Sequence, residues 1–168
     1  MGADPILGQD KAIGNRMINA RSEGIEDKPS YRRAIRKRRC LVLADGFYEW
    51  KKEGKSKVPH YIRLKSGEPF GFAGLWERWS APTGETIHSC TIITTSPNTL
   101  MKDIHHRMPV ILPRAAEEQW LDPTVEDPHA VLPLLQPYPD DELEAYAVSL
   151  TVNSPSNDVA ACIEPALK

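Results

Sequence analysis

The segment from residue 40 to residue 50, CLVLADGFYEW, decides the fold class because it predicts two strands around a turn. Residues 40–44 form a short apolar run, Asp45-Gly46 is a favoured turn or bulge dipeptide, and an aromatic extended run follows. Further strands are predicted for residues 60–64, 69–76, 86–95 and 145–153, and helices for residues 30–39 and 114–121. Short strands in series with two or three helices predict an α+β fold with a mostly antiparallel, barrel-like sheet.

The length and composition predict one globular domain over residues 1–168. No apolar run approaches the roughly 18 residues of a membrane span, and the beginning of the chain shows no secretory signal pattern. Cys40, Cys90 and Cys162 are odd in number and widely spaced, which indicates reduced thiols rather than a disulfide framework. These features predict a cytoplasmic location without a membrane partner.

The charge is distributed unevenly although the net charge is only -2. Lysines and arginines gather between residues 28 and 57, whereas residues 115–167 contain acids and neither Lys nor Arg. Such asymmetry indicates a polyanionic partner. The alternative is a basic helix face that is simply solvated.

A metal site is not expected, and neither is a cofactor. His105 and His106 lie in DIHHRMP, residues 103–109, and side chains alternate between the two faces of an extended segment. The two imidazoles would therefore not share one metal ion on a strand. The chain also contains no HExxH, CxxC or His-x-His pattern.

Two other places could carry chemistry. Glu49 shares a strand face with Phe47, and a carboxylate among aromatic residues is partly desolvated, which raises its pKa and suits acid–base catalysis. The alternative for Glu49 is an exposed position at a strand edge. Asn19, Arg21 and Glu23 alternate in INARSEG, so they could project together and bind a carbonyl, an amine or a phosphate. The alternative for this segment is a polar surface strand.

The motifs occur in the order INARSEG, RCLVLADGFYEWKK, TIITTSPN and DIHHRMPVIL. This series resembles the SRAP family, the SOS response-associated peptidase domains, over roughly residues 13–153. The resemblance implies a DNA-damage-response protein that shields abasic sites in single-stranded DNA, associated with the nucleoid if the source is bacterial. In the family the amine of an N-terminal cysteine forms a Schiff base with the abasic sugar, and its thiol then closes a thiazolidine ring.

The resemblance also implies roles for particular residues. Asn19 would hold the nucleophilic amine, Glu49 would act as acid and base in Schiff-base formation, and His105 would protonate the ring oxygen of the sugar. Imidazole suits that task because it exchanges protons near neutral pH.

Three further residues would bind DNA according to the same resemblance. Arg21 would contact a flanking phosphate, and Thr94 and Arg107 would contact phosphate or backbone. Binding that depends on such contacts weakens with salt, with a slope of roughly -0.7 per neutralised phosphate on single strands.

The family pattern differs from this chain at its beginning. The family starts with MCGR, whereas Met1 is followed here by Gly2, and the three cysteines are internal. We therefore expect single-strand binding and abasic-site sensing without a stable thiazolidine adduct, which leaves the question of enzymatic activity open. Two alternatives are a nucleic-acid-binding module without chemistry and a thiol peptidase that uses Cys40 or Cys90 with His105.

Overall fold

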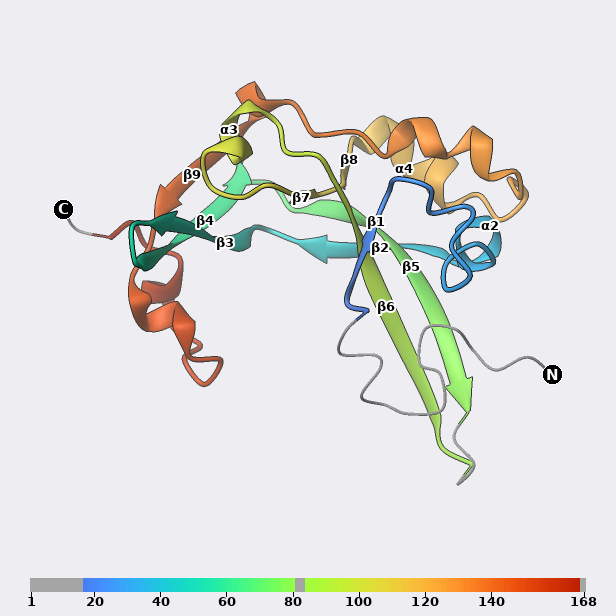
Figure 1. Ribbon diagram of the computed structural model, residues 1–168, viewed down its shortest axis with the longest axis horizontal. Helices are drawn as coiled ribbons and strands as arrows, with labels where there is room; N and C mark the ends of the chain where they lie inside the picture. The colour runs from blue at the N-terminus through green and yellow to red at the C-terminus, as the bar shows by residue number, and fades with distance from the viewer. Residues whose placement is uncertain (1–16, 81–83, 167–168) are drawn as a thin grey trace. The chain divides into compact units, whose positions relative to one another are not determined.

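The computed structural model describes residues 17–80 and 84–166, and it confirms the α+β prediction (Figure 1). The chain divides into two compact units. The first unit comprises the described residues up to 43 together with residues 71–95 and 109–137, and the second comprises residues 44–70, 96–108 and 138–166. The single domain over residues 1–168 stays a prediction.

The helices and strands follow one another along the chain, and most are short. In the first half they are β1 (Asn19–Arg21), α2 (Ala34–Lys37), β2 (Arg39–Ala44), β3 (Phe47–Glu53), β4 (Ser56–Leu64), β5 (Phe70–Ser80) and β6 (Thr86–Thr95). In the second half they are α3 (Thr99–Lys102), β7 (Met108–Pro109), β8 (Ile111–Leu112), α4 (Arg114–Leu121), η1 (Pro128–Ala130), η2 (Leu132–Leu134), η3 (Asp140–Glu142), β9 (Leu143–Ala147), η4 (Leu150–Asn153) and η5 (Ala160–Cys162). No helix in the described ranges has the length and apolar character needed to cross a membrane.

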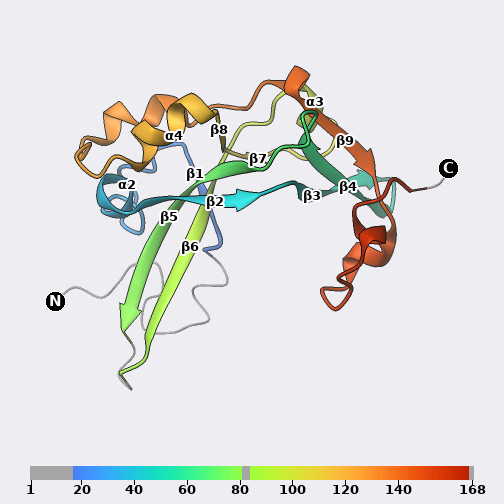
Figure 2. The ribbon, with the colours of Figure 1, turned by 180° about the vertical axis from the view of Figure 1, so that it is seen from behind.

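The first unit is built on a sheet with the strand order β1-β6-β5-β2. β5 and β6 form a long antiparallel hairpin, which both ribbon views show clearly (Figures 1 and 2). The β-branched residues of β6, TIHSCTIITT, favour this extended conformation. The three residues of β1 join β6 in the parallel direction, so this segment reaches the sheet from a distant part of the sequence.

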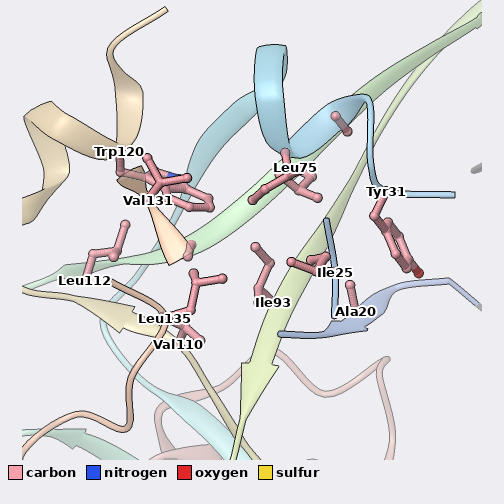
Figure 3. Packing of buried hydrophobic residues seen from close by; sticks show 13 residues of the cluster. Ala20, Ile25, Tyr31, Leu75, Ile93, Val110, Leu112, Trp120, Val131 and Leu135 are labelled. Carbon is pink, nitrogen blue, oxygen red and sulfur yellow. The ribbon is translucent and has the colours of Figure 1, made fainter. Parts of the chain in front are cut away.

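One face of this sheet carries the hydrophobic core. Leu75 of β5, Ile93 of β6 and Trp120 of α4 are fully buried, and Figure 3 shows them in one cluster. The cluster comprises Ala20, Ile25, Tyr31, Ala34, Ile35, Ala73, Leu75, Ile93, Val110, Leu112, Trp120, Val131 and Leu135. Burial of a large apolar side chain contributes about 1.5–3 kcal/mol, so this cluster is the main support of the first unit.

Arg39 fastens the beginning of β2 to α4. Its Nε donates to the Trp120 carbonyl at 2.6 Å and its Nη2 donates to the Asp122 carbonyl at 2.6 Å. Its Nη1 donates to the carbonyl of Ile35 at 2.8 Å. A guanidinium can satisfy several helix-terminal carbonyls at once, which explains how this charged side chain lies buried.

The second unit contains the antiparallel sheet β3-β4-β9. Tyr48 lies opposite Tyr61, and Tyr61 lies opposite Tyr146, so the three rings share one face of this sheet. Glu49 belongs to the other face because neighbouring residues on a strand alternate. The β3–β4 turn contains Gly54 with φ +61, a conformation that glycine adopts without strain.

Several element predictions need correction. The helix predicted for residues 30–39 is reduced to α2, because Arg39 already begins β2. The strand predicted for residues 145–153 ends at Ala147, and a 3-10 helix begins at Leu150. Gly74 lets β2 pack closely on β5, because a Cβ there would lie 3.0 Å from the Cys40 thiol.

Candidate active site

The strand β3 positions Glu49 in the second unit. Its antiparallel register with β4 places Glu49 opposite His60, and the tight turn at Gly54 fixes this register. The Glu49 side chain is 24% exposed, so its carboxylate is partly removed from water. This position confirms the predicted strand and leaves the carboxylate accessible to a substrate.

The turn after α3 positions His105. The Asn98 side chain caps α3 by accepting from the Met101 amide at 2.9 Å, and it donates to the Tyr138 carbonyl at 2.8 Å. The His105 amide then donates to the Met101 carbonyl at 2.8 Å. Met101 is fully buried, so this hydrogen bond holds the backbone of His105 in place.

Glu49 and His105 lie side by side. The Nδ1 atom of His105 is 3.7 Å from Oε1 of Glu49, which is too long for a hydrogen bond, and 3.0 Å from the carbonyl oxygen of Arg107. When Nδ1 donates its proton to that carbonyl, the other ring nitrogen, Nε2, can exchange a proton with a ligand.

The environment of Glu49 favours its protonated form. Burial raises the pKa of Glu49, and the His105 imidazole and the backbone amide of Trp50 lower this pKa only in part. A carboxyl group with a raised pKa holds a proton closer to neutral pH. The pair can therefore both donate and accept protons, as acid–base catalysis requires.

Replacing Glu49 with glutamine is expected to stabilise the folded protein at pH 7. Because the folded state raises the pKa of Glu49, it binds the proton more tightly than the unfolded state does. Stability is therefore lost as the pH rises above the ordinary glutamate pKa of about 4.3. Glu49→Gln removes this loss, so its advantage over the wild-type chain should appear at pH 7 and vanish at pH 4.

Urea unfolding at the two pH values measures this difference in the free energy of unfolding. Glu53→Gln is the matched control, because Glu53 is exposed at the end of the same strand. A Glu49→Gln variant that is less stable than the wild-type chain at pH 7 would contradict the prediction.

Asn19, Arg21 and Thr94 lie together in the first unit. Asn19 and Arg21 are exposed on β1, whereas Ala20 between them is buried. Arg21 pairs in register with Thr94, whose hydroxyl donates to the Ala20 carbonyl at 3.4 Å. The predicted alternation is confirmed for Asn19 and Arg21, but β1 ends before Glu23.

The histidine segment is not extended, as the alternation of His105 and His106 required. Residues 103–104 form a turn, residues 105–107 are irregular with a bend at His106, and β7 begins only at Met108. The rings of His105 and His106 are 4.4 Å apart, so the two side chains do not point to opposite faces. Arg107 is partly buried, and its amide lies 3.3 Å from Nδ1 of His105. In residues 17–80 and 84–166 no cluster of three or more His, Cys, Asp or Glu side chains could hold a metal ion.

Two residues that support the site were missed in the sequence. His60 faces Glu49 across the β3–β4 ladder, and the signal for it was the Glu53-Gly54-Lys55-Ser56 turn, which sets the pairing. Asn98 caps α3, and its signal was an asparagine just before a short apolar segment.

Together these features define an α+β protein that carries a paired glutamate and histidine as its candidate acid–base group. A sequence model of the family described as SOS response associated peptidase (SRAP) matches residues 1–155. The chain belongs to the SRAP family.

The similar proteins include bacterial and vertebrate members. The abasic site processing protein YoqW of Bacillus subtilis (strain 168) is 51% identical over 164 residues, which cover 97% of this chain and 73% of that protein. The abasic site processing protein HMCES of Gallus gallus is 33% identical, with 88% of this chain and 49% of that protein covered. A crystal structure of a protein from Bacteroides thetaiotaomicron matches with a TM-score of 0.90 and 35% identity, over 99% of this chain and 75% of that one.

Proposed function

We propose that this chain recognises abasic sites in single-stranded DNA as part of the response to DNA damage. Membership of the SRAP family supports the proposal, as do relatives that are named abasic site processing proteins. The observation that carries it is the pairing of Glu49 with His105, because a module that only binds nucleic acid has no use for an acid–base pair. A DNA partner places the protein in the compartment that holds DNA.

In this proposal the second unit handles protons at the abasic sugar. His105 donates a proton to the ring oxygen as the hemiacetal opens to the aldehyde. An amine of the chain, either its N-terminal amine or a lysine side chain, then adds to the aldehyde carbon. Glu49 transfers the protons that allow water to leave and the Schiff base to form. Each step needs a group that exchanges protons near neutral pH, which the raised pKa of Glu49 supports.

The first unit supplies DNA contacts in the same proposal. The exposed Arg21 binds a phosphate, because a guanidinium forms paired hydrogen bonds with phosphate oxygens. Thr94 contacts the backbone beside it, and Asn19 orients the amine. Arg107, in the second unit, contacts a further phosphate.

The cysteines fit a thiol mechanism poorly. Burial and the neighbouring Cys90 raise the pKa of Cys40 to about 11, so its thiol stays protonated at neutral pH and is a weak nucleophile. A thiazolidine also needs a free α-amine on the same residue. Cys40, Cys90 and Cys162 are internal, and their nitrogen atoms lie in peptide bonds.

Equilibrium binding tests the proposal. Fluorescence anisotropy would compare an intact single-stranded oligonucleotide, the same strand with one tetrahydrofuran abasic analogue, and a duplex containing that analogue. We expect the tightest binding to the single strand with the analogue. Arg21→Gln should make the slope of the logarithm of the binding constant against the logarithm of the salt concentration shallower by about 0.7. Arg114→Gln, at an exposed arginine of α4 outside the basic segment 28–57, is the matched control and should leave the slope unchanged.

Equal affinity for the intact strand and the strand with the analogue would contradict abasic-site recognition. Preference for the duplex would contradict the single-stranded substrate. Unchanged salt dependence of the Arg21→Gln variant would remove Arg21 from the phosphate contacts.

A further inference from the structure

The sheet of the first unit has one face that the core does not cover. The registers place Asn19 level with Ile92 and Gly74, and Trp76 level with Cys90. We call this surface the open sheet face. Its positions are Asn19 and Arg21 on β1, His88, Cys90, Ile92 and Thr94 on β6, and Trp76 and Arg78 on β5, whereas Gly74 is buried against Cys40 and Val42 of β2. The intervening residues Ala20, Ala73, Leu75 and Ile93 point into the core.

The charge of the open sheet face has one sign. Arg21 and Arg78 contribute two cations, and His88 lies opposite Arg78 across the β5–β6 ladder. None of the described β1, β5 and β6 positions on this face is Asp or Glu. Both arginines are exposed, as is His88. A surface of this kind complements a polyanion.

Trp76 stands between the two arginines along the hairpin. Its side chain is 38% exposed, although tryptophan is usually highly buried. Its backbone is fixed on both sides, by the pairing with Cys90 on β6 and by a 2.8 Å hydrogen bond from its amide to the Arg38 carbonyl. An exposed aromatic ring on a rigid strand is a platform on which a nucleobase can stack.

The spacing along β6 fits one extended strand of nucleic acid. The Trp76–Cys90 pair lies two residues from the level of Asn19, which is about 7 Å along the strand. Neighbouring bases of an extended single strand are separated by a distance of this order. The Arg78–His88 pair lies two residues further in the same direction.

We propose that the open sheet face is the track for the DNA strand on one side of the abasic nucleotide. Trp76 stacks on the base next to the abasic site, and Arg78 with His88 binds the phosphate beyond that base. The inference rests on the proposed function and adds a flanking-base subsite to it. The Gly71–Trp76 run thus serves both faces, since Leu75 packs in the core and Trp76 faces the ligand.

A thermodynamic cycle between protein and DNA tests the subsite. One single-stranded oligonucleotide carries one tetrahydrofuran analogue, and two others carry a second analogue at the neighbouring 5′ or 3′ position. Trp76→Ala should weaken binding to the first oligonucleotide by about 5- to 150-fold, the range for loss of one stacked base. The same variant should bind like the wild-type chain when the stacked base on the correct side is already absent.

Three further variants give the controls. Trp76→Phe should retain most of the affinity, and Arg78→Gln should lower the salt slope by about 0.7. Arg114→Gln should change neither quantity, because Arg114 belongs to α4, whose Trp120 packs on the covered face of the sheet. Circular dichroism of Trp76→Phe and Trp76→Ala shows whether both variants are folded.

The outcomes separate the inference from the function on which it rests. If the wild-type chain prefers the abasic strand and Trp76→Ala binds equally well, the subsite is overturned alone. If Trp76→Ala loses the same affinity with and without the flanking base, Trp76 has only a structural role. This result would also overturn the subsite. A dimer of the free protein that Trp76→Ala dissociates would assign the face to a second copy of the chain. A wild-type chain without preference for the abasic strand would overturn the proposed function, and the subsite with it.

Discussion

A His105→Gln variant is expected to react with an abasic single strand about 10²–10⁴-fold more slowly than the wild-type chain. The physical reason is the loss of a proton donor for the sugar ring oxygen, whose protonation opens the hemiacetal to the reactive aldehyde. Glutamine keeps a polar side chain of similar reach but cannot deliver a proton. The rate at which borohydride traps protein on an abasic oligonucleotide measures this effect.

The affinity for the tetrahydrofuran analogue separates chemistry from binding. The analogue has no hemiacetal to open, so His105→Gln should bind it within about twofold of the wild-type chain while its trapping rate falls. His129→Gln is the matched control, since His129 is exposed in the first unit and has no part in the proposed site. A trapping rate close to that of the wild-type chain would remove His105 from the chemistry and favour a binding module.

A Gly46→Ala variant is expected to lose about 3 kcal/mol of folding stability, the upper end of the usual cost of overpacking. A Cβ on Gly46 would overlap Cζ, Cε2 and the hydroxyl oxygen of Tyr61. Tyr61 is only 4% exposed, and its ring packs 5.2 Å from Tyr48 and 5.9 Å from Tyr146. The ring therefore has no free space into which it could move.

Gly54→Ala provides the comparison for this prediction. Gly54 has φ +61, and no heavy atom lies within 4 Å of a Cβ built there, so only backbone strain of about 1 kcal/mol is expected. Urea unfolding of both variants gives the two costs. Equal stabilities of Gly46→Ala and Gly54→Ala would contradict the prediction. They would show that the Tyr61 ring on the aromatic face of β3-β4-β9 can move to make room for the added methyl group.

The sequence predicted the elements whose signals are local. The strand with Glu49, the β-branched strand β6 and the helix after Pro113 are all confirmed. The helix predicted for residues 30–39 was wrong in its extent because two of the carbonyl partners of Arg39, those of Trp120 and Asp122, lie far along the chain. Such a partner cannot be read from spacing within the segment.

The candidate site was predictable in its residues but not in its geometry. The family resemblance singled out Glu49 and His105, and the structure brings them to 3.7 Å. The turn that carries His105 depends on Asn98, which reaches the Tyr138 carbonyl from a distant part of the sequence. For the same reason the alternation expected for His105 and His106 failed, since that rule holds only on a strand.

The parallel pairing of β1 with β6 has a consequence for the order of folding. Asn19 and Arg21 are synthesised before β6, with which their strand pairs. Contacts between residues so far apart in the chain form slowly, because the long intervening segment loses entropy when its ends meet. The local β5–β6 hairpin therefore forms first, and the open sheet face is completed only when β1 docks beside it. A nascent chain thus gains its proposed affinity for DNA late, after the core that supports this surface has begun to fold.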